Sequence, residues 1–158
     1  MNSNSKPPTK PPSSKTTSKT RTKSEQTNPM IDHLAIDVSD LAKSGHFYDQ
    51  SLAPLGHKKL SDAPVEFGGR LTLGWADSLE TEFYIGVGST TKPRLHIAFR
   101  AKDRQQVDDF YHAALAAGGI HNGKPGLRPQ YHENYYGAYV LDPDGHNVEA
   151  VCHELLDE

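Results

Sequence analysis

The sequence predicts an α+β fold built from two copies of one supersecondary unit. The main observation is a repeat at an offset of 63 residues, at which His33-Leu-Ala-Ile-Asp37 returns as His96-Ile-Ala-Phe-Arg100. The same offset relates Asp40 to Asp103, Phe47 to Phe110, Tyr48 to Tyr111, Leu52 to Leu115 and Gly56 to Gly119. In both copies a strand-like alternation is followed by a helical spacing of apolar residues, so each copy is expected to be a βαβββ unit.

The first copy begins with a strand over residues 30–38, because apolar and other side chains alternate there with period two. Its apolar face carries Leu34, Ile36 and Val38, and its other face carries His33, Ala35 and Asp37. Ser39 and Asp40 are suitable N-cap residues for the helix that follows. One stripe of that helix carries Leu41, Ser44, Tyr48, Leu52 and Leu55, and Pro54 and Gly56 end it.

Further strands of this copy are predicted near residues 57–60, over 71–75 and over 82–87. The second copy starts with a strand over residues 95–100, in which Ile97 and Phe99 match the apolar face of the first strand. Asp103 begins its helix, and Gly118-Gly119 ends it.

Residues 136–141 form the next predicted strand, and Asp142-Pro-Asp-Gly145 forms a tight turn. The last strand covers 147–153, with Val148, Ala150 and Cys152 on its apolar face and Asn147, Glu149, Val151 and His153 on the other. His146, directly after the turn, is expected to face solvent.

Composition divides the chain into a tail, residues 1–29, and one domain, residues 30–158. The tail is rich in Ser, Thr and Pro and holds six basic residues and one acid, so it is expected to be disordered, and the body carries most of the negative charge. The tail is either a solvating extension or a nuclear-targeting or polyanion-binding arm. The acidic body argues against nucleic acid as the main partner, and no apolar run reaches the length of a membrane span. Cys152 is the only cysteine, which suits a reducing compartment and predicts a cytoplasmic protein.

Three side chains on separate strands suggest a metal site. The repeat places His33 and His96 on equivalent faces, and Glu149 lies in an apolar setting where an unpaired carboxylate would be costly. Two imidazoles and one carboxylate suit a divalent transition metal with open positions, at which substrate oxygens are polarised. Iron, manganese, nickel and zinc all fit such a donor set, so the sequence does not name the metal.

Residues 30–154 resemble the vicinal oxygen chelate superfamily, which includes glyoxalase I, bleomycin- and fosfomycin-resistance proteins and extradiol dioxygenases. The resemblance rests on Met30-Ile-Asp-His33, Phe47-Tyr48, Leu55-Gly56, Leu95-His96-Ile-Ala-Phe99, Gly118-Gly119, Leu141-Asp-Pro-Asp-Gly-His146 and Asn147-Val-Glu149. It implies paired βαβββ units whose mixed sheet curls around a central cavity, with His33, His96 and Glu149 as metal ligands. It also implies a homodimer, in which units can exchange between chains so that a site combines residues of two subunits.

The fourth strand of the first unit departs from glyoxalase I, which has a metal-binding carboxylate or imidazole there. Tyr84 stands at the matching position and is a candidate substrate-binding residue, whereas a shift of two residues would offer Glu82. With Tyr84 in place, the three ligands resemble those of extradiol dioxygenases.

A second cluster is Tyr131-His132-Glu-Asn-Tyr135-Tyr136. His132 is a candidate general base, and Tyr135 or Tyr136, of which Tyr136 is preferred, is a candidate donor to a substrate oxygen. The alternative is an aromatic strand edge with a surface histidine. Arg100 and Arg128 are candidates for holding an anionic substrate group.

The leading hypothesis is a metal-dependent enzyme that acts on a small oxygenated molecule, with dioxygenase-like or lyase and isomerase chemistry. The alternative is a metal-free protein that sequesters a small molecule, as bleomycin-resistance proteins do. A third hypothesis is an interaction protein whose functional part is the basic tail.

Overall fold

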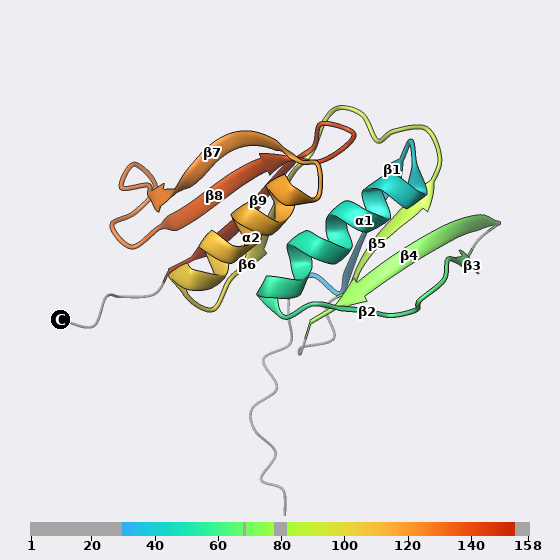
Figure 1. Ribbon diagram of the computed structural model, residues 1–158, viewed down its shortest axis with the longest axis horizontal. Helices are drawn as coiled ribbons and strands as arrows, with labels where there is room; N and C mark the ends of the chain where they lie inside the picture. The colour runs from blue at the N-terminus through green and yellow to red at the C-terminus, as the bar shows by residue number, and fades with distance from the viewer. Residues whose placement is uncertain (1–29, 68, 78–81, 154–158) are drawn as a thin grey trace, which may run out of the picture.

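The computed structural model describes residues 30–67, 69–77 and 82–153 of the 158-residue chain. The predicted basic tail, residues 1–29, lies outside the described residues. The α+β class and the two related units are confirmed, and the second strand of the first βαβββ unit is divided into two short segments that pair with the same neighbouring strand (Figure 1). The first unit contains β1 (His33–Val38), α1 (Leu41–Leu52), a 3₁₀ turn (Ala53–Leu55), β2 (Lys58–Lys59), β3 (Val65–Phe67), β4 (Arg70–Ala76) and β5 (Glu82–Val87). The second contains β6 (His96–Arg100), α2 (Arg104–Ala116), β7 (Ile120–Leu127), β8 (Tyr136–Leu141) and β9 (Asn147–Cys152).

Each unit forms its own mixed sheet. The first sheet has the order β1-β5-β4-β2, with β3 paired to β4, and the second has the order β6-β9-β8-β7. In both sheets the first strand of the unit pairs in parallel with the last, β1 with β5 and β6 with β9, and the remaining pairs are antiparallel. The predicted repeat is therefore a repeat of topology as well as of sequence.

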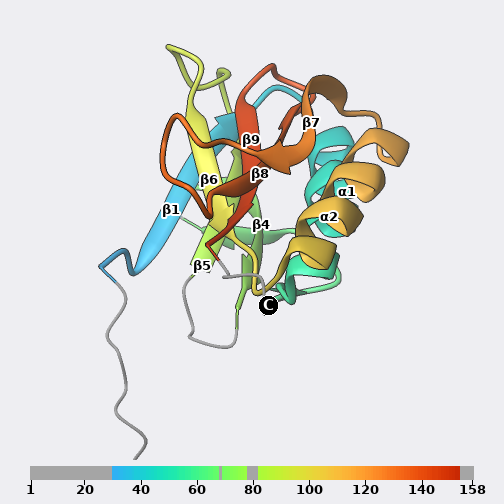
Figure 2. The same ribbon diagram turned by 90° about the vertical axis from the view of Figure 1, so that its left-hand side faces the viewer.

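The two helices pack against each other on one side of the two sheets (Figures 1 and 2). Both begin where the sequence predicts, because Asp40 and Asp103 accept hydrogen bonds from the backbone N–H groups of Lys43, at 3.0 Å, and Gln106, at 2.8 Å. Gly56 and Gly118 end the helical segments of the two units in the left-handed conformation that a side chain disfavours. The helices cover one face of the sheets, so the other face is left for side chains that need access to a ligand.

The core lies between the helices and the sheets. Its first half is aromatic: Tyr48 of α1 packs on Phe83 and Trp75, with ring centroids 4.8 and 5.9 Å apart. The alternation predicted for β1 and β6 holds, because Ile36, Val38, Ile97 and Phe99 are buried in this core. None of the helices in the described ranges is long and apolar enough to cross a membrane.

Strands β3 and β7 were not predicted. Strand β7 contains Asn122, Gly123, Pro125 and Gly126, which are poor strand formers, and its pairing with β8 shifts register twice. Such a sequence is tolerated because β7 is an edge strand, where a proline costs no ladder hydrogen bond on the open side.

The expectation that His146 faces solvent is wrong, because this side chain is 0% exposed. Its Nδ1 accepts a hydrogen bond from the backbone N–H of Leu95 at 3.1 Å, and its own backbone N–H donates to Asp142 at 2.7 Å. Asp142 is buried as well and accepts a hydrogen bond from the hydroxyl of Tyr48 at 2.7 Å. The Asp-Pro-Asp-Gly-His turn is therefore anchored into the core by both its carboxylate and its imidazole.

Candidate functional site

The second sheet carries a histidine–carboxylate pair on the face without helices. Glu149 of β9 lies beside Ala98 of β6, so its side chain reaches His96, two residues earlier on the same face of β6. The Nε2 atom of His96 lies 2.8 Å from Oε2 of Glu149. Glu149 is only 1% exposed, whereas about half of the His96 side chain is exposed. The pair therefore consists of a buried carboxylate and an imidazole at the opening of a cavity.

Tyrosines enclose the carboxylate from the other side. The hydroxyl of Tyr135 donates to Oε1 of Glu149 at 2.6 Å, so each carboxylate oxygen has a partner. Tyr131 and Tyr139 join Tyr135, His96 and Glu149 in lining a cavity of about 340 Å³. This environment compensates the charge of a carboxylate that would otherwise be costly to bury.

The tyrosine hydroxyls remain protonated donors at neutral pH. Burial and then the nearby charge of Glu149 raise the pKa of Tyr139 to about 12. Burial and the hydrogen bond to Glu149 raise the pKa of Tyr135 well above its ordinary value. Gly137 makes room for this arrangement, because a Cβ atom there would lie 2.8 Å from Oε1 of Glu149 and 3.2 Å from the ring of Tyr135.

Asn147 orients the imidazole of the pair. Its Nδ2 lies 2.5 Å from Nδ1 of His96, and its Oδ1 accepts a hydrogen bond from Asn122 at 2.9 Å. An amide that donates to Nδ1 leaves the ring proton on Nε2, where it is donated to Glu149. A cation bound at Nε2 would require the ring proton on Nδ1, and the amide of Asn147 would then have to turn its oxygen toward the ring to accept that proton.

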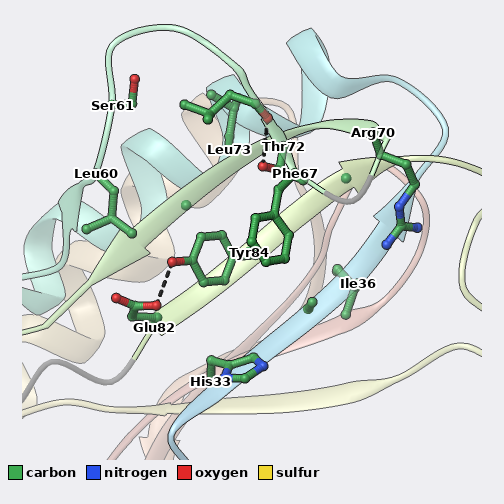
Figure 3. Close-up of a pocket in the computed structure, with 14 residues that line it drawn as sticks. His33, Ile36, Leu60, Ser61, Phe67, Arg70, Thr72, Leu73, Glu82 and Tyr84 are labelled. Carbon is green, nitrogen blue, oxygen red and sulfur yellow. Dashed lines mark hydrogen bonds between the residues drawn. The ribbon is translucent and has the colours of Figure 1, made fainter.

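The first sheet carries the other predicted ligand in a separate cavity of about 520 Å³ (Figure 3). His33 and Glu82 are direct neighbours on the parallel strands β1 and β5, and both line this cavity. His33 also lies against its sequence neighbour Asp32, with Nδ1 2.7 Å from the carboxylate. The hydroxyl of Tyr84 donates to Glu82 at 2.5 Å, and this hydrogen bond, with burial, raises the pKa of Tyr84 to about 12.

The strand register decides which residue of β5 corresponds to Glu149. Tyr84 lies beside Ala35, two residues after His33, just as Glu149 lies beside Ala98, two residues after His96. Tyr84 therefore holds the position equivalent to Glu149, and Glu82 holds the position equivalent to Asn147. Both alternatives that the sequence left open lie on the cavity face, and their side chains are hydrogen-bonded to each other.

The three predicted metal ligands are not brought together within one chain. His96 and Glu149 share one cavity, and His33 lines the other. Across the residues that the structure describes, no three His, Cys, Asp or Glu side chains are placed so that they could hold a metal ion together. The symmetry of the repeat puts His33 and His96 on equivalent strands, but these strands belong to different sheets.

Of the two predicted catalytic residues, the side chain of His132 lies next to Tyr135, whereas the side chain of Tyr136 points toward α2. Nε2 of His132 is 2.7 Å from Nδ1 of His153, and the His132 ring contacts Tyr135 edge-on, with centroids 5.6 Å apart. The hydroxyl of Tyr136 donates to Asp108 of α2 at 2.8 Å, which places this side chain on the helix side of the sheet. The residue that meets Glu149 is its neighbour Tyr135.

The two predicted arginines border the second sheet. Arg128 lies over the ring of Tyr139, with its guanidinium carbon 5.4 Å from the ring centroid, and donates to the backbone carbonyls of Lys124 and Leu127. Arg100 is exposed on β6, on the face that also carries His96. Asn147 was placed on the face of Glu149 by the alternation along β9, but it was given no role. Tyr139 was not singled out from the sequence, although the same alternation along β8 puts it beside Glu149.

Comparison with known proteins gives the family. Residues 30–150 match the model of the Glyoxalase/Bleomycin resistance protein/Dioxygenase superfamily, and the chain belongs to this superfamily. No curated protein matches the chain.

Solved structures of this family share the fold. A glyoxalase/bleomycin resistance protein from Albidiferax ferrireducens T118 is 29% identical, with a TM-score of 0.61 over 78% of this chain and 98% of that one. A glyoxalase/bleomycin resistance protein/dioxygenase family enzyme from Burkholderia phytofirmans PsJN is 17% identical, with a TM-score of 0.57 over 78% of this chain and 98% of that one. A mutant of the fosfomycin resistance protein FosX from Listeria monocytogenes, complexed with Mn(II) and 1S,2S-dihydroxypropylphosphonic acid, is 20% identical, with a TM-score of 0.57 over 79% of this chain and 90% of that one.

Proposed function

We propose that this protein is a metal-dependent enzyme of the superfamily that acts on a small oxygenated molecule. His33, His96 and Glu149 are the proposed ligands of a divalent cation, and its identity is left among iron, manganese, nickel and zinc. The observation that carries the proposal is the buried Glu149 carboxylate, held by His96 at 2.8 Å and by Tyr135 at 2.6 Å at the base of an open cavity.

The donor set of this cavity suits a cation. Several divalent transition metals accept a neutral imidazole and a carboxylate as ligands. Metal sites also contain residues that orient these ligands by hydrogen bonds. Tyr135 and Asn147 fill this role here, because they bind Oε1 of Glu149 and Nδ1 of His96 and leave Oε2 and Nε2 facing each other. When bound, the metal would supply Lewis-acid polarisation of substrate oxygens.

The full ligand set is proposed to form between two copies of the chain. His33 of one copy would complete the site of His96 and Glu149 of the other, and a symmetric dimer would contain two such sites. The support for this is that the two half-sites lie in separate cavities of one chain, and that both half-sites lie on sheet faces that the helices leave free.

The side chains around the two cavities would bind and orient the substrate. Tyr84 and Glu82 lie next to His33, and this hydrogen-bonded pair could hold or accept a proton at the Glu82 carboxylate. His132, which is hydrogen-bonded to His153, is the proposed base at the opening of the cavity that contains Glu149. Tyr135 replaces Tyr136 as the proposed hydroxyl donor. Arg100 and Arg128 remain candidates for anionic substrate groups. The reaction stays within the oxygenase and lyase or isomerase classes of the superfamily.

Mixing two inactive variants tests the proposal. His33→Ala and His96→Ala should each lose bound metal, as measured by elemental mass spectrometry after reconstitution, whereas the control His46→Ala, on the exposed face of α1, should not. If the two inactive variants are mixed and allowed to exchange subunits, one intact site forms in each mixed dimer, and about a quarter of the wild-type metal content returns. A site contained within one chain would give no recovery, and unchanged metal content in His96→Ala would refute metal binding by this set.

A metal-free binding protein is the second candidate. It is favoured by the size and apolar lining of the cavity in the first sheet, which could hold a ligand without His96 and Glu149. The hypothesis of a metal-free binding protein predicts that chelator-treated protein and the Glu149→Gln variant bind a small-molecule ligand as well as the wild type does.

A further inference from the structure

Two amide side chains connect the His96 ring to the opposite edge strand of the second sheet. Asn147 is the direct neighbour of His96 on the paired strands β9 and β6, and its Nδ2 lies 2.5 Å from Nδ1 of the ring. Asn122, on the edge strand β7, donates from its Nδ2 to Oδ1 of Asn147 at 2.9 Å. Together with the 2.8 Å contact between Nε2 of His96 and Glu149, these side chains form one continuous row of hydrogen bonds.

A β-bulge brings Asn122 into this row. The pairing of β7 with β8 shifts register between His121 and Gly123, so Asn122 is the extra residue of β7 at this point. The ring of His121 meets the hydroxyl of Tyr111 of α2 at 2.7 Å, on the helix side of the sheet. The next side chain along the strand therefore lies on the other face, which is the face of Glu149. Bulges redirect side chains in this way beside functional sites.

The contact between His96 and Glu149 fixes the direction of every hydrogen bond in the row. Nε2 and a carboxylate oxygen at 2.8 Å need a proton between them, and the imidazole supplies it. Nδ1 of the neutral ring is then an acceptor, so Asn147 turns its Nδ2 to the ring and its Oδ1 to Asn122. When a cation replaces the proton on Nε2, the ring proton is on Nδ1, and both amides must turn over to keep their hydrogen bonds. An amide can reverse in this way because it carries a donor and an acceptor.

We propose that Asn122 and Asn147 form a reversible amide relay, which holds the His96 ring and turns over when a divalent cation takes the place of the Nε2 proton. Asn122 acts through Asn147 and is therefore a positioning residue. The inference rests on the proposed function, because the cation is assigned to His96 and Glu149. A carboxylate only accepts hydrogen bonds, so a carboxylate in place of either amide biases the row toward the ring with a proton on Nδ1.

The protonation of the His96 ring in the metal-free protein is the first test. Nitrogen NMR of the full-length protein with isotope-labelled histidine is recorded at alkaline pH, where an imidazole is neutral, and His96→Ala identifies the signal. Nδ1 should carry no proton in the wild type, a proton in Asn147→Asp, and a proton in a fraction of the molecules in Asn122→Asp. A protonated Nδ1 in the wild type, or an unprotonated Nδ1 in Asn147→Asp, would overturn the relay.

The affinity for zinc is the second test, and a double variant separates the relay from the effect of added charge. Competition with a chelator of known affinity should show about 10- to 100-fold weaker zinc binding in Asn147→Ala. Asn122→Asp should bind zinc about 2- to 10-fold more tightly, since it changes one exposed hydrogen bond. This gain should largely disappear when Asn122→Asp is made in the Asn147→Ala protein, because the amide between the new carboxylate and the ring is missing. A gain of the same size in the double variant would show an effect of charge alone and would overturn the relay.

The two tests also separate the relay from the proposed function. Changed protonation of His96 with the same zinc affinity in every variant, His96→Ala included, would refute the proposed metal site, whereas the relay would stand as the control of the ring proton. Zinc binding that is lost in His96→Ala but is the same in all variants of the two asparagines would overturn the relay and leave the proposed metal site intact.

Discussion

The adjacent tyrosines 135 and 136 provide a sharp test of the proposed site. They differ in the face of the second sheet to which they contribute, since the Tyr135 hydroxyl donates to Glu149 and the Tyr136 hydroxyl donates to Asp108 of α2. Replacing each tyrosine by phenylalanine removes one hydroxyl and keeps the ring. The two variants are therefore chemically matched, and only the location of the lost hydrogen bond differs.

The expected magnitudes follow from these partners. A cation that takes up His96 and Glu149 would leave the Tyr135 hydroxyl as the donor that holds Oε1. Loss of a residue that orients a metal ligand weakens metal binding by about 10- to 100-fold, so this is the loss expected for Tyr135→Phe. Tyr136→Phe should leave metal affinity unchanged and lower the free energy of unfolding by about 0.5–1.5 kcal/mol, because only its hydrogen bond to α2 is lost.

Competition with a chelator of known affinity measures the dissociation constant of the metal, and urea unfolding of the metal-free protein measures stability. If Tyr136→Phe weakens metal binding as much as Tyr135→Phe does, the assignment of the donor to Tyr135 is refuted. If neither variant alters metal affinity, the Glu149 carboxylate is not a ligand that these tyrosines position.

Three other perturbations have defined outcomes. Tyr48→Phe removes the donor to the buried carboxylate of Asp142, and urea unfolding should show a loss of about 1–3 kcal/mol, so a loss close to zero would contradict the buried hydrogen bond. Gly137→Ala places a methyl group against Oε1 of Glu149 and should lower metal content without preventing folding, as elemental analysis and circular dichroism would show; an unchanged metal content would argue against Glu149 as a ligand. Burial lowers the pKa of His57, with the charge of Asp77 acting in the opposite direction, so the unfolded chain binds more protons below about pH 6.5 and stability should fall as the pH drops from 7. The urea midpoint of His57→Gln should depend less on pH over that range than the midpoint of the wild type does. If the two pH profiles superimpose, His57 is not the origin of the pH dependence of stability.

The elements were predictable where local chemistry decides them. Both helices begin at aspartates that cap them, and β1, β6, β8 and β9 alternate with period two. Strands β3 and β7 were missed because their extended conformation is imposed by a neighbour: β3 is three residues long and pairs with β4, and β7 pairs with β8 despite its glycines and proline. Pairing across a sheet is a non-local interaction that a short window of sequence does not contain.

The site was predictable in part. Period two on β6 and β9, with the repeat, placed His96 and Glu149 on one face, and the structure brings them within hydrogen-bonding distance. The alternation of side chains along the strand also puts Tyr136 and Tyr135 on opposite faces. Tyr136 lies beside the buried Cys152 of β9, whereas Tyr139, four residues after Tyr135 and on the same face, lies beside Glu149. The alternation of the sequence therefore favours Tyr135 over Tyr136 as the tyrosine that faces Glu149.

The sequence by itself determined the two units, their helix starts, the faces of the main strands and the family resemblance, because capping, alternation and repetition are local properties of the chain. The tertiary structure alone decided how the two units lie relative to each other. It put His33 in one cavity and His96 with Glu149 in another, and it buried His146 in the core. The repeat in the sequence places His33 and His96 at matching positions of two sheets. The distance between these residues depends on how the two sheets are arranged. That arrangement is set by the packing of α1 on α2 and by the burial of both helices against their sheets.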